Sequence, residues 1–200
     1  MGKRAPVGRS TTTDEQLIAV TVGERVPHNA PIDLVDYDPA WPALFERERR
    51  RIVAALGDTV LRIEHTGSTS VPGLAAKPII DITLIVPDSG DEAAYVPRLE
   101  AAGYVLRIRE PNWHEHRVLK GPDTDVNLHV FSLGSPELQR MVGFRDWLRT
   151  HDADRVLYEG TKRALAARTW RHIQHYADAK TAVVEEILGR AGQPAGTTFD

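Results

Sequence analysis

The stretch IEHTGSTSVPGLAAKPIIDITLIV, residues 63–86, places a Gly-Ser turn and a single aspartate next to apolar runs. A glycine lets the backbone approach a ligand closely, and a neighbouring hydroxyl adds a hydrogen-bond donor. Such a turn can hold phosphate oxygens on backbone N–H groups. A carboxylate inside an apolar strand is costly unless it is paired or bound to a ligand. The pattern predicts that Gly67, Ser68 and Thr69 bind phosphate and that Asp81 is a catalytic or metal-binding residue. The alternatives are a plain tight turn and a structural salt bridge.

Histidines are the side chains best suited to assist Asp81. His129 lies in the predicted strand DVNLHVF, where it would face the same groove as Asp81. The pair could bind a divalent metal. Mg²⁺ prefers oxygen ligands, so the imidazole favours Mn²⁺, Zn²⁺ or Fe²⁺. His65, just before the turn, is a further catalytic candidate or a packing residue. His114 and His116 have the spacing of two metal ligands on one strand face, although paired histidines also occur by chance.

Basic side chains supply candidates for binding an anion. Lys77, in the loop before the Asp81 strand, could reach a phosphate or simply pair with Asp81. In the last third of the chain, Tyr and Lys twice stand four residues apart, which places each pair on one helix face. These candidates are Arg145, Tyr158, Lys162, Tyr176 and Lys180. The alternative is that they belong to the solvated faces of ordinary amphipathic helices.

Composition restricts the class of protein. The 200 residues are 42% hydrophobic and 26% charged, with a formal net charge of −3, which suits one globular domain and argues against a nucleic-acid partner. The chain contains no cysteine, which excludes disulfides and thiolate metal sites and fits a cytoplasmic protein. No apolar run reaches the ~18 residues that span a bilayer. The expected partner is therefore a small-molecule substrate.

The periodicity of apolar residues predicts the elements that position these side chains. We expect a mostly disordered tail over residues 1–29, one domain over 30–191 and a flexible tail over 192–200. Alternation predicts strands at 32–35, 59–66, 77–86, 104–110, 114–121 and 125–134. Helical spacing predicts helices at 38–57, 89–103, 135–151, 152–167 and 169–191. In the second of these, Pro97 predicts a kink or a late start. The order indicates an α+β fold, with a mixed sheet, flanking helices and a helical carboxyl-terminal layer.

Several segments together resemble the GrpB family over about residues 32–188, namely YDPAWPALFERE, IEHTGSTSVPGLAAKPIIDI, NLHVF, FRDWLRTH and YADAKTAVVEEIL. The resemblance implies a nucleotidyltransferase-like fold of the DNA polymerase β-like superfamily, with a divalent metal and a nucleoside triphosphate at the turn and the aspartate. It also implies an intracellular protein. The family includes domains fused to dephospho-CoA kinases, for which an accessory folding role has been proposed. The superfamily pattern has a second carboxylate two residues after the aspartate, where this chain has Thr83.

Three functions are consistent with the sequence. The leading hypothesis is an enzyme that transfers a nucleotidyl group, or catalyses a related phosphate-anhydride reaction, on a phosphate-bearing or anionic small molecule. The second, favoured by Thr83, is metal- or acid/base-assisted condensation, cyclisation or hydrolysis of a small metabolite without nucleoside triphosphate. The third is a non-catalytic binding or accessory folding module.

Overall fold

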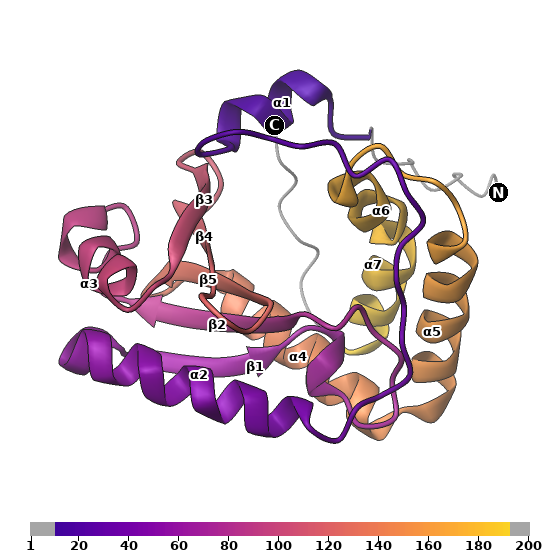
Figure 1. The fold of residues 1–200 in the computed structure, drawn as a ribbon. Coiled ribbons are helices and arrows are strands. Elements are labelled where there is room, and N and C mark those ends of the chain that lie inside the picture. The colour runs from indigo at the N-terminus through magenta and orange to yellow at the C-terminus, as the bar shows by residue number, and fades with distance from the viewer. Residues whose placement is uncertain (1–10, 193–200) are drawn as a thin grey trace, which may run out of the picture.

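Five strands form one mixed sheet in this computed structural model, which describes residues 11–192 (Figure 1). The strands are β1 (Arg62–Thr66), β2 (Ile80–Val86), β3 (Val105–Glu110), β4 (His116–Lys120) and β5 (Val126–Ser132). Their order across the sheet is β1-β2-β5-β4-β3. β2 and β5 run parallel, and the other three neighbouring pairs are antiparallel. The mixed sheet with flanking helices confirms the predicted α+β class.

The described residues also form seven α-helices and three short 3₁₀ turns. The helices are α1 (Asp14–Val20), α2 (Trp41–Leu56), α3 (Val96–Ala101), α4 (Pro136–Thr150), α5 (Asp152–Ala166), α6 (Ile173–Ala179) and α7 (Thr181–Arg190). The 3₁₀ turns are η1 (Gly57–Thr59), η2 (Ser68–Ser70) and η3 (Glu92–Ala94). Figure 1 shows α5, α6 and α7 grouped together on one side of the sheet, as a carboxyl-terminal helical layer. None of the helices in residues 11–192 is long and apolar enough to cross a membrane.

The two faces of strand β2 meet different helices. Ile82 is fully buried and packs in one core with residues of α2 and α3. Because side chains alternate between faces along a strand, Asp81 and Ile85 lie on the other face. There Ile85 packs in a smaller cluster with Leu138 of α4. Asp81 is therefore on the face that carries α4, opposite the main core.

Local sequence signals predicted several helix ends to within a few residues of their observed positions. The first predicted helix, 38–57, begins at Trp41, because Asp38 accepts a hydrogen bond from Ala40 N at 2.8 Å in the turn that precedes it. The late start predicted at Pro97 is confirmed, since η3 comes first and α3 begins only at Val96. The predicted strand 32–35 is wrong, because only Val35 forms an isolated bridge, with Ala76.

The segment before the domain differs from the predicted disordered tail over residues 11–29. A capping box between Thr13 and Gln16 starts α1, and Thr21 bridges to Ile108 beside β3. Asp14 forms ion pairs with Arg171 at 2.6 Å and with His172 at 3.1 Å. Residues 1–10 and 193–200 of the predicted tails lie outside the described residues.

The same segment explains why the last predicted helix, 169–191, is two helices that begin later. The N–H of His28 donates to Arg171 O at 2.8 Å, and Ala30 bridges to Trp170. These contacts hold Trp170 and Arg171 against residues 28–30, so helical structure starts only at Ile173. Lys180 then separates α6 from α7.

Candidate functional site

The Gly-Ser turn lies directly against the aspartate carboxylate. The antiparallel register of β1 and β2 sets Thr66 opposite Asp81, and the chain turns at Gly67. Gly67 has φ 65° and ψ −174°, a region essentially restricted to glycine. A Cβ atom at this position would lie 2.3 Å from Asp81 Oδ2. The turn therefore needs glycine for both its backbone conformation and its approach to Asp81.

Asp81 is oriented by two side chains of the parallel neighbour β5. Asn127 Nδ2 donates a hydrogen bond to Asp81 Oδ1 at 2.7 Å, and His129 Nε2 lies 3.8 Å from the same oxygen. Burial raises the pKa of Asp81, but His129, Asn127 and Lys77 lower it more, so the net shift is downward and the carboxylate form is favoured. The structure thus brings Asp81 and His129 together, as the sequence predicted. Asn127, two residues before His129 on β5, was not among the predicted site residues.

The two predicted Tyr-Lys pairs lie near the Gly67–Ser68 turn and Asp81, at the start of β2. Lys162 is 2% exposed, and its Nζ donates to Ser68 Oγ at 3.1 Å and also to Ala75 O. Its ammonium lies 4.8 Å from the ring centre of Tyr158, and burial lowers its pKa to about 7. The Lys180 ammonium lies 4.5 Å from the ring centre of Tyr176. Burial lowers the pKa of Lys180 to about 8, against a smaller opposing effect of the Asp81 charge.

The amine of Lys77 and the phenols of Tyr158 and Tyr176 also lie around the predicted site. Lys77 is half-buried; burial lowers its pKa, while Asp81 acts in the opposite direction. Burial raises the pKa of Tyr158 to about 12, against a smaller opposing effect of its hydrogen bond with Ser68. The buried Tyr176 hydroxyl has no hydrogen-bond partner within residues 11–192. Lys77 and Lys180 thus interact with Asp81, and Lys162 lies at the adjacent turn, which places three amines where an anion could bind.

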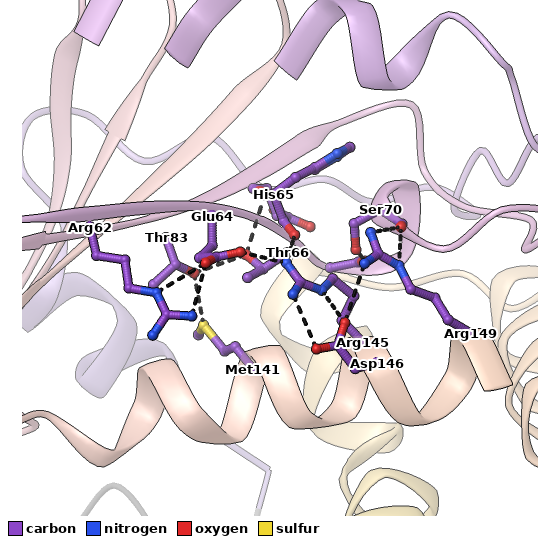
Figure 2. A network of polar contacts seen from close by, with 12 residues as sticks. Arg62, Glu64, His65, Thr66, Ser70, Thr83, Met141, Arg145, Asp146 and Arg149 are labelled. Atoms are coloured by element: carbon purple, nitrogen blue, oxygen red, sulfur yellow. Dashed lines mark hydrogen bonds and ion pairs between the residues drawn. The ribbon is translucent and has the colours of Figure 1, made fainter. Parts of the chain in front are cut away.

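His65 and Thr69 are not brought to this side of the sheet. Figure 2 shows His65 pointing away from the helix that carries Met141 and Arg145. His65 is 7% exposed, stacks on Phe45 with ring centres 4.8 Å apart, and hydrogen-bonds Thr69 Oγ1 at 3.0 Å. Burial lowers the pKa of His65 to about 4, so its ring is neutral. The predicted trio of Asp81, His129 and His65 is therefore not assembled, because the register pairs His65 with Ile82 on the opposite face.

Arg145 anchors the sheet rather than presenting a free guanidinium (Figure 2). Its Nη1 donates to Glu64 Oε2 at 2.8 Å and to His65 O at 2.9 Å, and its Nε donates to Asp146 Oδ1 at 2.7 Å. The side chain is 10% exposed. These contacts join α4 to the end of β1, directly before the Gly67–Ser68 turn. Arg145 therefore helps to position this turn.

We expect Arg145→Gln to lower the free energy of unfolding by about 3 kcal/mol, because it removes the buried guanidinium that pairs with Glu64. Arg149→Gln, on the same helix, is the matched control. Arg149 is more exposed and donates to Ser70 O, so its loss should cost only about 1 kcal/mol. Urea denaturation of the two variants measures the difference. Equal stabilities, with loss of ligand affinity only in Arg145→Gln, would show that Arg145 binds substrate instead.

Asp81 and His129, the predicted metal ligands, lie close together, but no third side chain of a metal-binding type joins them in the described residues. Among residues 11–192, no group of three or more His, Cys, Asp or Glu side chains could hold a metal ion. Thr83, two residues after Asp81, is fully buried beneath α4, where its hydroxyl bonds Thr66 Oγ1 at 2.9 Å and Met141 Sδ at 3.2 Å. Asp81 alone does not supply the paired carboxylates of a two-metal centre, so the stabilisation of phosphate charge at this site would fall to the amines.

The His114–His116 pair is also not a two-ligand strand face. β4 begins only at His116, and His114 lies in the preceding turn with φ 52°. Glu115 shares the left-handed conformation, with φ 50°. The two rings therefore do not follow strand alternation, and His116 instead points along the sheet toward His129, with ring nitrogens 3.0 Å apart.

Comparisons with known proteins agree on one family. The family model described as GrpB protein matches residues 31–190. A UPF0157 protein of Halalkalibacterium halodurans is 63% identical over 90% of this chain and 92% of its own length. A UPF0157 protein of Streptomyces coelicolor is 48% identical over 83% of this chain and 87% of its own length.

A crystal structure supports the same relationship. The conserved protein GrpB from Enterococcus faecalis is 31% identical to this chain and superimposes with a TM-score of 0.69. The match covers 80% of this chain and 96% of the crystallised one. The family match includes the Gly67 turn, Asp81 and both Tyr-Lys pairs within its bounds. The chain therefore belongs to the GrpB family.

Proposed function

We propose that the protein binds a phosphate-bearing small molecule, with a nucleotide as the first candidate, and transfers a nucleotidyl or phosphoryl group from it to a small acceptor. The observation that carries the proposal is the gathering of Lys77, Lys162 and Lys180 around Asp81 and the Gly67–Ser68 turn. Two relatives named dephospho-CoA kinase also support nucleotide-related chemistry. They are 30% identical to this chain, which matches 48% and 51% of their lengths.

The side chains at this site suit two separate roles. Asp81 would act as the base, and the lysines would stabilise negative charge. Asp81 is ionised and partly exposed, so its carboxylate can accept the proton of an attacking hydroxyl or amine. Lys162 and Lys180, together with backbone N–H groups of the turn, would stabilise the negative charge on the transferred phosphate. A divalent metal such as Mg²⁺ or Mn²⁺ stays a prediction, and the amines supply positive charge whether or not one binds.

The direct test is calorimetry with ATP, GTP, CTP and UTP, each with Mg²⁺ or Mn²⁺, on the wild type and Asp81→Ala. A nucleotide that binds the folded state should also stabilise it by about 2.7 kcal/mol at a hundredfold excess over Kd. Binding should weaken in Asp81→Ala if the carboxylate holds a metal, and persist if the amines alone hold the phosphates. If no nucleotide binds under any condition, the proposed transfer is wrong.

Nucleotide binding at pH 8 should also take up protons. The pKa values of about 7 for Lys162 and about 8 for Lys180 leave both amines partly neutral, and a bound phosphate raises them. The apparent binding enthalpy should therefore depend on the ionisation enthalpy of the buffer. Lys162→Met should reduce the uptake. Arg163→Met, the exposed neighbour on α5, should leave it unchanged, and uptake that Lys162→Met does not alter would exclude this amine from the site.

A second candidate is acid/base chemistry on an anionic metabolite without nucleoside triphosphate. The specific observation in its favour is Thr83, which is buried under α4 where the transferase pattern has a second carboxylate. It predicts that inorganic phosphate or a small phosphate ester binds where nucleotides do not, and that Asp81→Ala abolishes turnover while binding persists. A non-catalytic module, in contrast, would keep its biological activity in Asp81→Ala.

A further inference from the structure

Ser68 lies on a sharp strand-to-helix turn, directly beside a buried lysine. β1 ends at Thr66, Gly67 takes the restricted conformation described above, and Ser68 begins η2. The side chain of Ser68 is half-buried, and Nζ of Lys162 on α5 lies 3.1 Å from its Oγ. A serine on a strained turn of this kind, with an amine within hydrogen-bond reach, has the geometry of an activated nucleophile.

A backbone carbonyl orients the amine of Lys162. Its Nζ also donates to Ala75 O, in the loop between η2 and β2. This loop is itself fixed, because Ala75 N donates to Glu159 Oε2 at 3.1 Å and Ala76 forms a bridge with Val35. A nucleophile, a base in contact with it and a third group that orients the base are the parts of an activated-serine site. All three parts are present here.

The surroundings of Lys162 favour the neutral amine that a base requires. The residue is 2% exposed, and burial lowers its pKa to about 7. Lys180 and Arg163 lower this pKa further, while Glu159 acts in the opposite direction. A neutral amine has two N–H groups and one lone pair. With one N–H donated to the loop carbonyl, the lone pair can accept the O–H of the serine.

Tyr158 lies on a further side of Ser68 Oγ. It is 5% exposed and forms a hydrogen bond with Ser68, and its pKa of about 12 keeps the phenol protonated at neutral pH. When Ser68 donates its hydrogen to Lys162, a lone pair of Oγ is left to accept the Tyr158 O–H. This hydrogen bond would strengthen as Oγ gains negative charge during an attack.

We infer that Ser68 is a catalytic nucleophile, activated by Lys162, which carries the transferred group as a covalent intermediate. In the first step, Ser68 Oγ forms a bond to phosphorus as the bond from phosphorus to the leaving oxygen breaks. The leaving group keeps that electron pair, and the proton of Ser68 passes to Lys162 Nζ. In the second step, the acceptor oxygen bonds to phosphorus as the bond to Oγ breaks. Oγ takes back its proton from Lys162, and the proton of the acceptor goes to Asp81.

This intermediate deepens the proposed function, on which the identity of the donor rests. Direct transfer needs donor and acceptor in the site together, whereas a covalent intermediate lets the donor leave before the acceptor binds. The ammonium formed on Lys162 in the first step stays beside the phosphate on Ser68 and stabilises its charge. The same amine therefore serves first as a base and then as a cation.

The test is labelling of the full chain by a small alkyl fluorophosphonate between pH 6 and pH 9, without nucleotide. The serine oxygen displaces fluoride from phosphorus, so the adduct is detected by intact mass and placed by peptide mapping. We expect one adduct, on Ser68, that is absent in Ser68→Ala. Its rate should rise with pH through about 7 and then level off, as Lys162 loses its proton.

Two substitutions of Lys162 separate its role as a base from its positive charge. Lys162→Met removes both, and Lys162→Arg keeps the charge without a usable base, so each should slow labelling about 100-fold. Arg163→Met is the control and should label like the wild type. Circular dichroism checks that the variants are folded, and the pH profile of the wild type tests the base without any substitution.

An unlabelled Ser68, a wild-type rate without the rise near pH 7, or equal rates in the wild type and a folded Lys162→Met would overturn the inference. Nucleotide binding to a protein whose Ser68 is not labelled would leave the proposed function standing as a direct transfer. Labelling of Ser68 in a protein that binds no nucleotide would support the nucleophile and overturn only the nucleotide donor.

Discussion

Gly67→Ala will destabilise the protein by about 4 kcal/mol and displace the Asp81 carboxylate. Two costs add at this position. The backbone conformation, with φ 65° and ψ −174°, is strained by about 1–3 kcal/mol for any residue with a side chain. The new Cβ would also lie 2.3 Å from Asp81 Oδ2 and 2.8 Å from Asp81 Cβ, so β2 or the turn must shift. Urea denaturation and nucleotide calorimetry measure the two consequences.

Gly73→Ala is the matched control for Gly67→Ala. Gly73 also has positive φ, 76°, but a Cβ there would meet no atom within 4 Å. It should cost only the backbone strain, about 1 kcal/mol, and leave ligand binding intact. Adding Asp81→Ala to Gly67→Ala should recover part of the stability, since it removes the clashing carboxylate. If Gly67→Ala and Gly73→Ala cost the same, the close approach of the turn to Asp81 is not what the position requires.

Lys162→Met will remove a steep pH dependence of stability. Burial lowers the pKa of Lys162 from its ordinary value of 10.5 to about 7 in the folded protein. Between these values the unfolded chain binds the proton and the folded one does not, so stability rises with pH by up to ~1.4 kcal/mol per unit. From pH 7 to pH 10 this amounts to about 3 kcal/mol. As the pH falls back through this window, the same stability is lost.

The measurement is urea denaturation at pH 7, 8, 9 and 10, taken as the difference between wild type and Lys162→Met. The difference isolates Lys162 from Lys180, which titrates in both proteins. Arg163→Met should run parallel to the wild type, because an arginine stays charged throughout this range. Parallel curves for the wild type and Lys162→Met would mean that Lys162 is not desolvated and that its place in the anion site is wrong.

Sequence reasoning was most accurate where the signal is local. β2 and its aspartate followed from an apolar run, and the Tyr-Lys pairs followed from four-residue spacing on helices. The late start of α3 followed from Pro97, which cannot supply the N–H that a helix interior needs. In each case the deciding interaction lies within a few residues of the chain.

Predictions that depended on register or on distant partners were less accurate. His65 was predicted to be either a catalytic residue or a packing residue, and the β1–β2 register places it on the face opposite Asp81, where it packs. His114 was expected on a strand, but it lies in the tight turn between β3 and β4. Residues 169–172 were predicted to be helical, but the contacts of Trp170 and Arg171 with residues 28–30 keep them out of the helix.

The sequence by itself determined that a glycine turn precedes a strand with one aspartate, and that Tyr-Lys pairs lie on later helices. Local conformational preferences and hydrophobic spacing suffice for these features. Only the tertiary structure decided that Arg145 is an anchor, that Lys162 is buried against Ser68, and that His116 of β4 contacts His129 beside Asp81. The last of these arrangements arises because β5 lies between β2 and β4, and all three depend on the packing of the whole chain rather than on any one segment.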